Sequence, residues 1–264
     1  MMKIGVIPNS FELPFKEAAL LARDMGVEGL QPYVTRGELA PENLSAQDRE
    51  DLVKFVQSND LVFSALCADF GLNFKTKGDN EEGILRTMRM MDLAKDLGTN
   101  VITTHIGKVP EDENCEEYAN MVATIERLGK YGDAIGVVFA TETGPEPAVS
   151  LKGVLDKADT KSAKVNLDPA NLFMCAGENP VHSVRVLGDY IAHTHAKDGQ
   201  MNADGSYTEY PLGKGGVPFK EYIGALKLIG YDGFLTIERE GGASRMDDIR
   251  NGVQLLRSIL NELY

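Results

Sequence analysis

The stretch Val137-Val138-Phe139-Ala140-Thr141-Glu142 is a short apolar and β-branched run that ends on a carboxylate. Runs of this kind are typical of buried strands. The same arrangement recurs in the segments 163–168, 191–195 and 233–238, which end on Asp168, His195 and Glu238. Each of these end residues is of a type that binds metal ions. Four such endings in succession predict that the strand ends converge in space.

On either side of these segments, short apolar runs alternate with longer amphipathic stretches along the whole chain. The runs predict eight strands, at residues 3–8, 29–34, 61–65, 100–104, 137–142, 163–168, 191–195 and 233–238. The amphipathic stretches predict eight helices, at residues 15–25, 46–59, 81–97, 115–131, 148–158, 180–190, 218–229 and 247–263.

Alternating strands and helices produce a parallel sheet, and eight units allow the sheet to close into a (β/α)8 TIM barrel. An open doubly wound sheet is the competing architecture, but the first strand-helix junction, at 8–14, has no glycine for a pyrophosphate turn. We therefore expect one barrel domain over residues 1–264. Its one long connection, at 199–217, is predicted to be a loop or lid over the site.

The composition limits the partners of the protein. Forty acidic against 27 basic residues give a formal charge of -13, which disfavours nucleic acid and other polyanions. The first residues contain no apolar signal segment, and no run is long enough to span a membrane. The three cysteines are widely spaced and fit no disulfide framework. We expect a cytoplasmic protein, with homo-oligomerisation left open.

In a barrel of this type the active site lies at the carboxyl ends of the strands, where the four residues fall. Glu142 shares a strand face with Val138 and Ala140, which would fill the barrel beneath it. Taken singly, an acid at a strand end is as often a solvated turn residue. Together, three carboxylates and one imidazole favour Mn²⁺, with Mg²⁺, Co²⁺ or Zn²⁺ as alternatives.

The other three histidines are expected to have different roles. His193 is predicted to be a packed interior residue rather than a ligand, and His182 to lie on the surface of a helix. His105 follows the fourth predicted strand, so it is placed at the rim. It would contact substrate there or serve as an ordinary loop histidine.

The motifs TETGPE at 141–146, NLDPANL at 166–172, HTHAKD at 193–198 and LGKGGVPF at 212–219 resemble those of the xylose-isomerase-like TIM barrels. This superfamily includes sugar phosphate isomerases and epimerases, ketose 3-epimerases, hydroxypyruvate isomerase and endonuclease IV. The resemblance extends over essentially the whole chain. It implies a barrel fold and a carbohydrate substrate, but it does not specify which sugar.

The resemblance implies a role for each matched position. Its metal ligands are Glu142, Asp168, His195 and Glu238, the same four residues that the strand ends select. In the epimerase branch the two glutamates, Glu142 and Glu238, also act as catalytic acid and base. The positions implied to contact substrate are His105, Asn171, Lys197 and Asp198.

Two departures from the family pattern concern metal and substrate. Asn171 occupies a position where several members have histidine, and Cys67 lies where the endonuclease branch has a histidine ligand. With four histidines in the chain, a three-zinc cluster would lack ligands.

The predicted activity is isomerisation or epimerisation of a sugar or sugar phosphate through a metal-stabilised enediolate. A lyase that dehydrates a keto-inositol or sugar acid at the same site is the alternative. An endonuclease-like or non-catalytic sugar-binding barrel is more remote. Whether the glycine-containing loops 213–216 and 241–245 bind a phosphate or are simple turns is left open.

Overall fold

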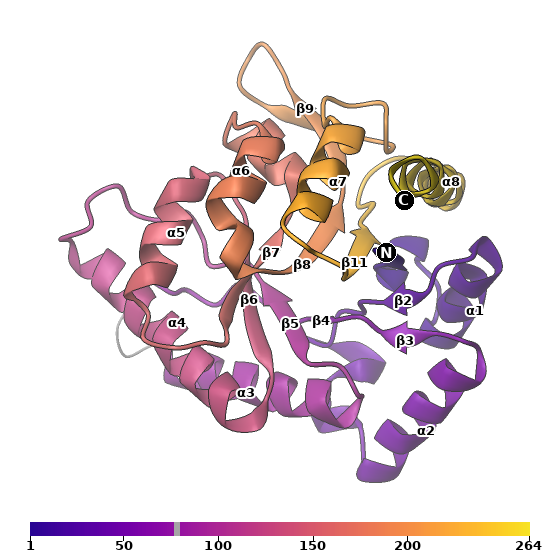
Figure 1. Ribbon diagram of the computed structural model, residues 1–264. Helices are drawn as coiled ribbons and strands as arrows, with labels where there is room; N and C mark the ends of the chain where they lie inside the picture. Colours follow the sequence, from indigo (N-terminus) through magenta and orange to yellow (C-terminus); the bar gives the residue numbers. More distant parts are fainter. Residues whose placement is uncertain (77–79) are drawn as a thin grey trace.

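The structure is a computed structural model that describes residues 1–76 and 80–264. In this part of the chain, nine short strands form one parallel sheet in the order β3-β2-β1-β11-β8-β7-β6-β5-β4 (Figure 1). These strands are β1 (Lys3–Val6), β2 (Gly29–Leu30), β3 (Val62–Phe63), β4 (Leu66–Cys67), β5 (Val101–Thr104), β6 (Val138–Glu142), β7 (Ala163–Leu167), β8 (Ile191–Ala196) and β11 (Phe234–Ile237).

The sheet closes through β3 and β4, which are two halves of one barrel strand separated by residues 64 and 65. On one side, the Ser64 N–H donates to the carbonyl of Leu30 at 2.8 Å. On the other side, the Ala68 N–H donates to the carbonyl of Thr103, also at 2.8 Å. The third barrel strand therefore passes from β2 to β5. The result is the predicted eight-unit barrel.

The helices form a ring outside the strands, as Figure 1 shows. They are α1 (Phe15–Met25), α2 (Ala46–Ser58), α3 (Glu81–Asp96), α4 (Glu116–Ile135), α5 (Ala148–Lys157), α6 (Pro180–Leu187), α7 (Phe219–Leu228) and α8 (Arg245–Leu263). Alternation of these helices with parallel strands confirms the predicted TIM barrel.

Several predicted boundaries were wrong. The strand predicted at 29–34 ends as β2 at Leu30, because Pro32 has no N–H to donate to a ladder. The strand predicted at 61–65 is split into β3 and β4. The helix predicted at 180–190 ends at Leu187. A separate short 3-10 helix follows it over Gly188–Tyr190.

The long connection predicted as a loop contains an antiparallel hairpin. Its strands are β9 (Asp198–Met201) and β10 (Tyr207–Tyr210), and Tyr207 pairs with Met201. Period-two alternation is weak over four residues, so the sequence pattern did not distinguish this hairpin from irregular loop. The hairpin projects from the main body of the barrel (Figure 1).

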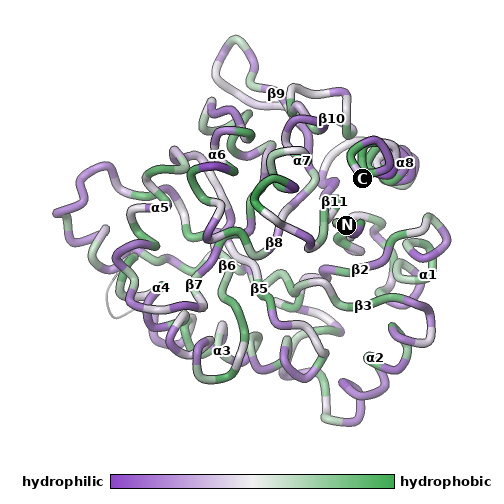
Figure 2. The backbone as a smooth tube through the Cα atoms, viewed as in Figure 1, coloured by the Kyte–Doolittle hydropathy of each residue, from purple (hydrophilic) through white to green (hydrophobic). Residues whose placement is uncertain are grey.

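The hydrophobic core has two parts. The larger part lies between the sheet and the helices, along which apolar and polar residues alternate (Figure 2). The smaller part is formed by Ala65, Val101 and Ala140, with Val138 packed against them. Val138 and Ala140 were predicted to lie beneath Glu142, and the structure brings both residues into this small cluster.

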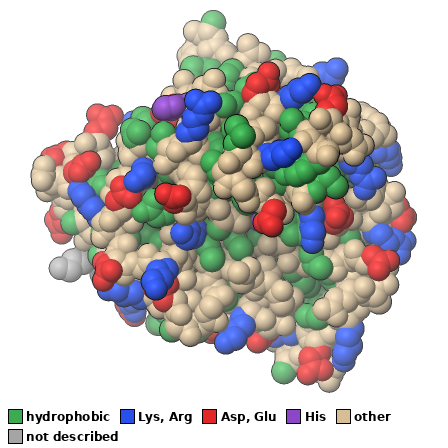
Figure 3. Space-filling view, viewed as in Figure 1, with side chains coloured by type: hydrophobic (Ala, Val, Ile, Leu, Met, Phe, Trp, Pro, Cys, Tyr) green, Lys and Arg blue, Asp and Glu red, His purple; other side chains and the backbone are tan. Residues whose placement is uncertain are grey.

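The surface carries charges of both signs. On the face drawn in Figure 3, acidic and basic side chains are interspersed over the barrel. Among the helices of the described segments, none has the length and apolar character needed to cross a membrane.

Candidate metal centre and active site

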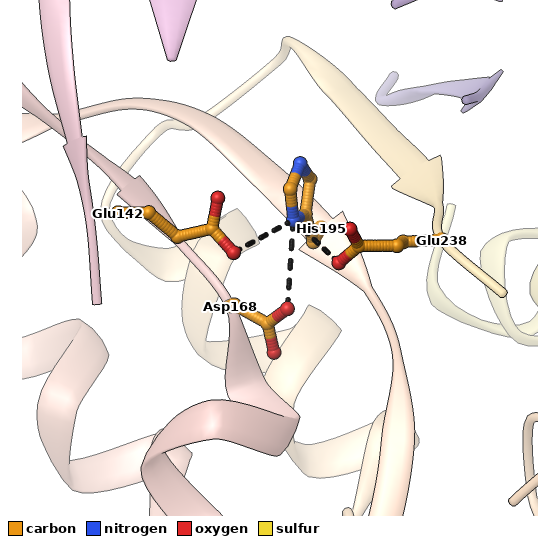
Figure 4. Close-up of side chains that lie close together, drawn as sticks. All are labelled: Glu142, Asp168, His195 and Glu238. Atoms are coloured by element: carbon orange, nitrogen blue, oxygen red, sulfur yellow. Dashed lines mark ion pairs between the residues drawn. The ribbon is translucent and has the colours of Figure 1, made fainter. Parts of the chain in front are cut away.

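Four neighbouring barrel strands bring the predicted ligands together. Glu142 is the last residue of β6, Asp168 follows β7, His195 lies in β8 and Glu238 follows β11. These strands are consecutive in the sheet order, so their carboxyl ends are adjacent. One ligand atom from each residue lies within 4.8 Å of the others, and all four side chains are buried (Figure 4).

His195 faces all three carboxylates of this metal cluster. Its Nδ1 lies 3.3 Å from Glu142 Oε1 and 3.2 Å from Glu238 Oε2. The third distance, to Asp168 Oδ2, is 3.5 Å. Figure 4 shows the glutamate carboxylates approaching from opposite sides, with Asp168 between them. The four donors therefore point toward a common centre.

Asp168 provides a test of whether the cluster suits a cation. Its Oδ1 accepts hydrogen bonds from the N–H groups of Ala170 and Asn171, at 2.7 and 2.9 Å. Its Oδ2 is buried and has no hydrogen-bond partner among the described residues. A buried carboxylate oxygen without a donor is costly. A divalent cation held by the four residues would satisfy it, and three carboxylates with one imidazole suit a hard or borderline ion.

Two amide side chains lie against the imidazole, and the oxygen of Gln31 is the acceptor that orients it. Gln31 Oε1 lies 3.2 Å from His195 Nε2, and Gln31 Nε2 donates to Thr103 Oγ1 at 2.8 Å. Asn166 Nδ2 donates to Glu142 Oε2 at 3.1 Å and lies 3.1 Å from His195 Nε2. A proton on Nε2 directed at Gln31 leaves the Nδ1 lone pair facing the carboxylates. This is the usual outer support of a histidine ligand.

Charge within the cluster is only partly balanced. Burial alone would lower the pKa of His195, but Glu142 and Glu238 raise it well above its usual value. Burial also opposes ionisation of Glu238, yet Lys197 and His195 hold the pKa of that carboxyl well below its usual range. The pKa of Asp168 is raised by its burial.

Lys197, predicted to contact substrate, lies buried beside the cluster. Its Nζ is 3.1 Å from Glu238 Oε2 and also forms an ion pair with Glu240. Its side chain is 7% exposed, so the ammonium is largely withdrawn from water. The structure thus places a fixed positive charge against one of the two predicted catalytic carboxylates.

Asn171 and His105, two further predicted substrate contacts, both lie next to Glu142. Asn171 Nδ2 donates to Glu142 Oε1 at 3.2 Å and to the carbonyl of Thr143 at 3.1 Å. His105 Nε2 lies 3.5 Å from Glu142 Oε1, and its Nδ1 lies 2.8 Å from Asp69 Oδ2. Glu142, against the effect of burial, and Asp69 raise the pKa of His105 to about 10.

Asp198 occupies the start of the hairpin. Its Oδ1 accepts hydrogen bonds from the N–H groups of Gly199 and Val217, at 2.9 and 3.0 Å. Its Oδ2 accepts from Gly213 and Gly215, both at 2.9 Å. The carboxylate therefore holds the two ends of the loop together. These backbone N–H groups of the loop could otherwise bind a substrate phosphate, but they donate hydrogen bonds to the Asp198 carboxylate instead.

The remaining histidines lie where they were expected. His193 is buried, with its Nε2 2.9 Å from both Gln31 Oε1 and Thr236 Oγ1. His182 is exposed on α6.

Sequence reasoning missed Gln31, Asn166 and Asp69. Asn166 could have been found, because it lies two residues before Asp168 and hence on the same strand face. Gln31 is a polar residue inside a predicted apolar strand, which is a weaker indication. Asp69 lies beyond the third predicted strand, and no sequence pattern indicated that it would contact His105.

Over residues 19–259 the chain matches the family model of the xylose isomerase-like TIM barrel, and it belongs to this family. It is 25% identical to an uncharacterised protein of Methanocaldococcus jannaschii, over 98% of this chain and 100% of that one. It is 31% identical to an L-ribulose 3-epimerase of Methylomonas sp. (strain DH-1), over 52% of this chain and 48% of the epimerase.

The fold is shared with solved structures. That of a probable 3-DHS dehydratase of Bacillus anthracis gives a TM-score of 0.81 at 21% identity, covering 97% of this chain and 99% of the other. At that level of identity the likeness concerns the barrel itself.

Proposed function

We propose that this protein is a divalent-metal-dependent isomerase or epimerase of sugars or sugar phosphates. The observation that carries the proposal is the pair Glu142 and Glu238, whose buried carboxylates face each other across one cluster with Asp168 and His195. The family and the epimerase relative support a carbohydrate substrate. A cytoplasmic role in carbohydrate metabolism belongs to the same proposal.

The reaction requires removal of a proton from a carbon next to a carbonyl group. This step leaves an enediolate with negative charge on oxygen, which must be stabilised. A divalent ion held by the four residues, with Mn²⁺ proposed and Mg²⁺, Co²⁺ or Zn²⁺ as alternatives, would supply positive charge to those oxygens.

The two glutamates would transfer the proton. Because they approach the centre from opposite sides, one can remove a proton from one face of a substrate carbon while the other returns a proton to the opposite face. This sequence inverts the stereocentre and is an epimerisation. If one glutamate acted alone on a single face, aldose-ketose isomerisation would result.

The substrate-binding residues remain His105, Asn171, Lys197 and Asp198 in this proposal. His105 is half exposed, so it is suited to meet substrate oxygens directly. Lys197 is buried and would meet only those substrate oxygens that reach the cluster. Asn171 already holds Glu142 through its amide. Asp198 would act mainly by fixing the hairpin loop, since both of its oxygens accept backbone hydrogen bonds.

Dehydration is the second candidate, and Lys197 is the observation that favours it. An ammonium beside Glu238 could donate a proton to a departing hydroxyl group after the first proton is removed. The likeness in fold to a probable 3-DHS dehydratase is compatible with this alternative. The substrate would then be a keto-inositol or a sugar acid.

A solvent-exchange assay tests the proposal. The Mn²⁺-loaded protein is incubated in D₂O with ketoses, aldoses, their phosphates and keto-inositols, and deuterium incorporation and water loss are followed by NMR. Incorporation next to a carbonyl selects the isomerase or epimerase, and water loss selects the lyase. Glu142→Gln and Glu238→Gln should abolish exchange, whereas His182→Ala, at an exposed position on α6, should not. Equal loss in all three variants would contradict the assignment.

A further inference from the structure

A cleft of about 630 Å³ opens beside the metal cluster, over the carboxyl ends of β2 and β4. Its lining includes Tyr33, Asp69 and Glu240, together with two arginines, Arg36 and Arg86. Neither arginine has a role in the chemistry proposed above. The question is what two guanidinium groups do at this position.

The cleft adjoins the metal cluster on two sides. A second cavity, of about 210 Å³, is lined by Glu238 and shares Tyr33 and Glu240 with the cleft. On the other side, Asp69 lines the cleft and pairs with His105, which lies 3.5 Å from Glu142. A substrate whose reacting end lies at the cluster would therefore extend toward the arginines.

The acidic groups of the cleft already have cationic partners. Asp69 pairs with His105 at 2.8 Å, and Glu240 pairs with Lys197. By contrast, Arg36 and Arg86 form no ion pair with any carboxylate in residues 1–76 and 80–264. The cleft thus contains two positive charges whose counter-charge is not supplied by the described residues.

Arg86 is held in place by other contacts. Its Cζ lies 4.5 Å from the ring centroid of Phe70, and its Nη2 donates to the carbonyl of Thr35. The other N–H groups of the guanidinium have no recorded partner in the described residues. A guanidinium that is already fixed in this way loses little further conformational freedom when it binds an oxyanion. Its planar fork matches carboxylate or phosphate oxygens.

The two loops that the sequence offered as phosphate-binding sites, 213–216 and 241–245, are less suitable than the arginines. In the first loop, the N–H groups of Gly213 and Gly215 donate hydrogen bonds to Asp198. In the second, the first turn of α8 carries Asp247 and Asp248, which repel an anion, and Arg245 pairs with Glu12. The arginines of the cleft are the better placed cations.

We propose that Arg36 and Arg86 bind an oxyanionic group, a carboxylate or a phosphate, at the end of the substrate away from the reacting carbon. This inference rests on the proposed function for the reacting end and narrows the substrate to an anionic sugar derivative. The overall charge of -13 is compatible, because it opposes polyanions at long range while two local guanidinium groups bind a single small anion.

The first test is a titration of the Mn²⁺-loaded protein with inorganic phosphate, in which isothermal titration calorimetry measures the affinity. The variants are Arg36→Gln and Arg86→Gln, and the control is Arg89→Gln, an exposed arginine on α3 that lines neither cavity. Affinity should fall roughly 10- to 100-fold in the first two, the range for losing a hydrogen bond to a charged group, and stay unchanged in the third. Equal affinity in all variants, or no binding by the wild type, would overturn the inference.

Folding of each variant is checked by its thermal midpoint. Arg86→Gln loses the contact with Thr35 and could lower the midpoint, so Arg86→Lys, which keeps the charge, is included. Arg36 is exposed, and Arg36→Gln decides the outcome if Arg86→Gln does not fold.

The second test compares solvent exchange for a neutral sugar, the same sugar with a terminal phosphate and the same sugar with a terminal carboxylate. The anionic form preferred by the cleft should have a lower KM, and Arg36→Gln should remove that advantage with a smaller effect on kcat. The phosphate and carboxylate arms identify the source of the oxyanion. Equal KM for neutral and anionic forms would refute the inference and leave the proposed function standing. No exchange with any sugar would refute the proposed function, and the phosphate titration would still decide the arginine site.

Discussion

Gln31 Oε1 lies 3.2 Å from Nε2 of His195, although the two residues are 164 positions apart. Gln31 is buried and its amide is itself fixed by Thr103. A proton on Nε2 directed at this oxygen leaves the Nδ1 lone pair facing the three carboxylates. A residue directly after β2 therefore supports a predicted ligand that belongs to β8.

Replacing Gln31 by methionine, which has a similar shape and no amide, should weaken Mn²⁺ binding. We expect a loss of roughly 10- to 100-fold, as is common when the outer partner of a histidine ligand is removed. Calorimetric titration measures the effect, and Gln57→Met, at an exposed position on α2, is the control. Unchanged affinity in Gln31→Met would show that the amide does not orient His195.

Lys197→Met should destabilise the fold. The substitution leaves Glu238 buried beside Glu240 without its ammonium partner. Removing one member of a buried ion pair costs about 3 kcal/mol or more, so the urea midpoint should fall clearly. Lys220→Met, which breaks an exposed pair with Glu262, should leave the midpoint unchanged. A similar midpoint in both variants would argue against a buried charge at position 197.

Asp198→Ala should loosen the hairpin connection. The carboxylate accepts four backbone hydrogen bonds, two per oxygen, that tie residue 199 to residues 213–217. Their loss should cost at least about 2 kcal/mol and increase hydrogen exchange of the β9 and β10 amides. Asp204→Ala, at the tip of the hairpin, should affect only the turn. Unaltered exchange in Asp198→Ala would mean that the hairpin is held by other contacts.

The cysteines should differ in reactivity. Burial raises the pKa of Cys67 to about 12, so at pH 8 only about one thiol in ten thousand is ionised. Iodoacetamide reacts with the thiolate, and its rate at Cys67 should stay low and rise with pH up to that value. Cys115 is partly exposed and should be alkylated in the native protein. Peptide mapping by mass spectrometry measures both, and rapid alkylation of Cys67 at pH 7 would show that its site opens readily.

The sequence was sufficient for the barrel and for the four clustered residues, for a physical reason. Alternation of strands and helices dictates a parallel sheet, and parallel strands place their carboxyl ends together. Glu142, Asp168, His195 and Glu238 each lie at such an end, so their convergence follows from the fold without knowledge of any side-chain contact.

The contacts of the supporting residues could not be predicted in the same way. The contact of Gln31 with His195 spans the interior of the barrel from the end of β2 to β8, with β1 and β11 between them in the sheet. The contact of Asn166 with Glu142 depends on the register of β6 with β7, in which the two residues are direct partners. Register and closure are tertiary properties, and the single sequence carries only a weak indication of either.

Binding of Mn²⁺, measured by the loss of the free-ion signal in electron paramagnetic resonance, tests the central claim most directly. The account predicts one ion per chain in the wild type and in His182→Ala. It predicts a large loss of affinity in Asp168→Asn, which alters the carboxylate whose buried Oδ2 has no hydrogen-bond donor in the described residues. Absence of binding in the wild type, or undiminished binding in Asp168→Asn, would contradict it.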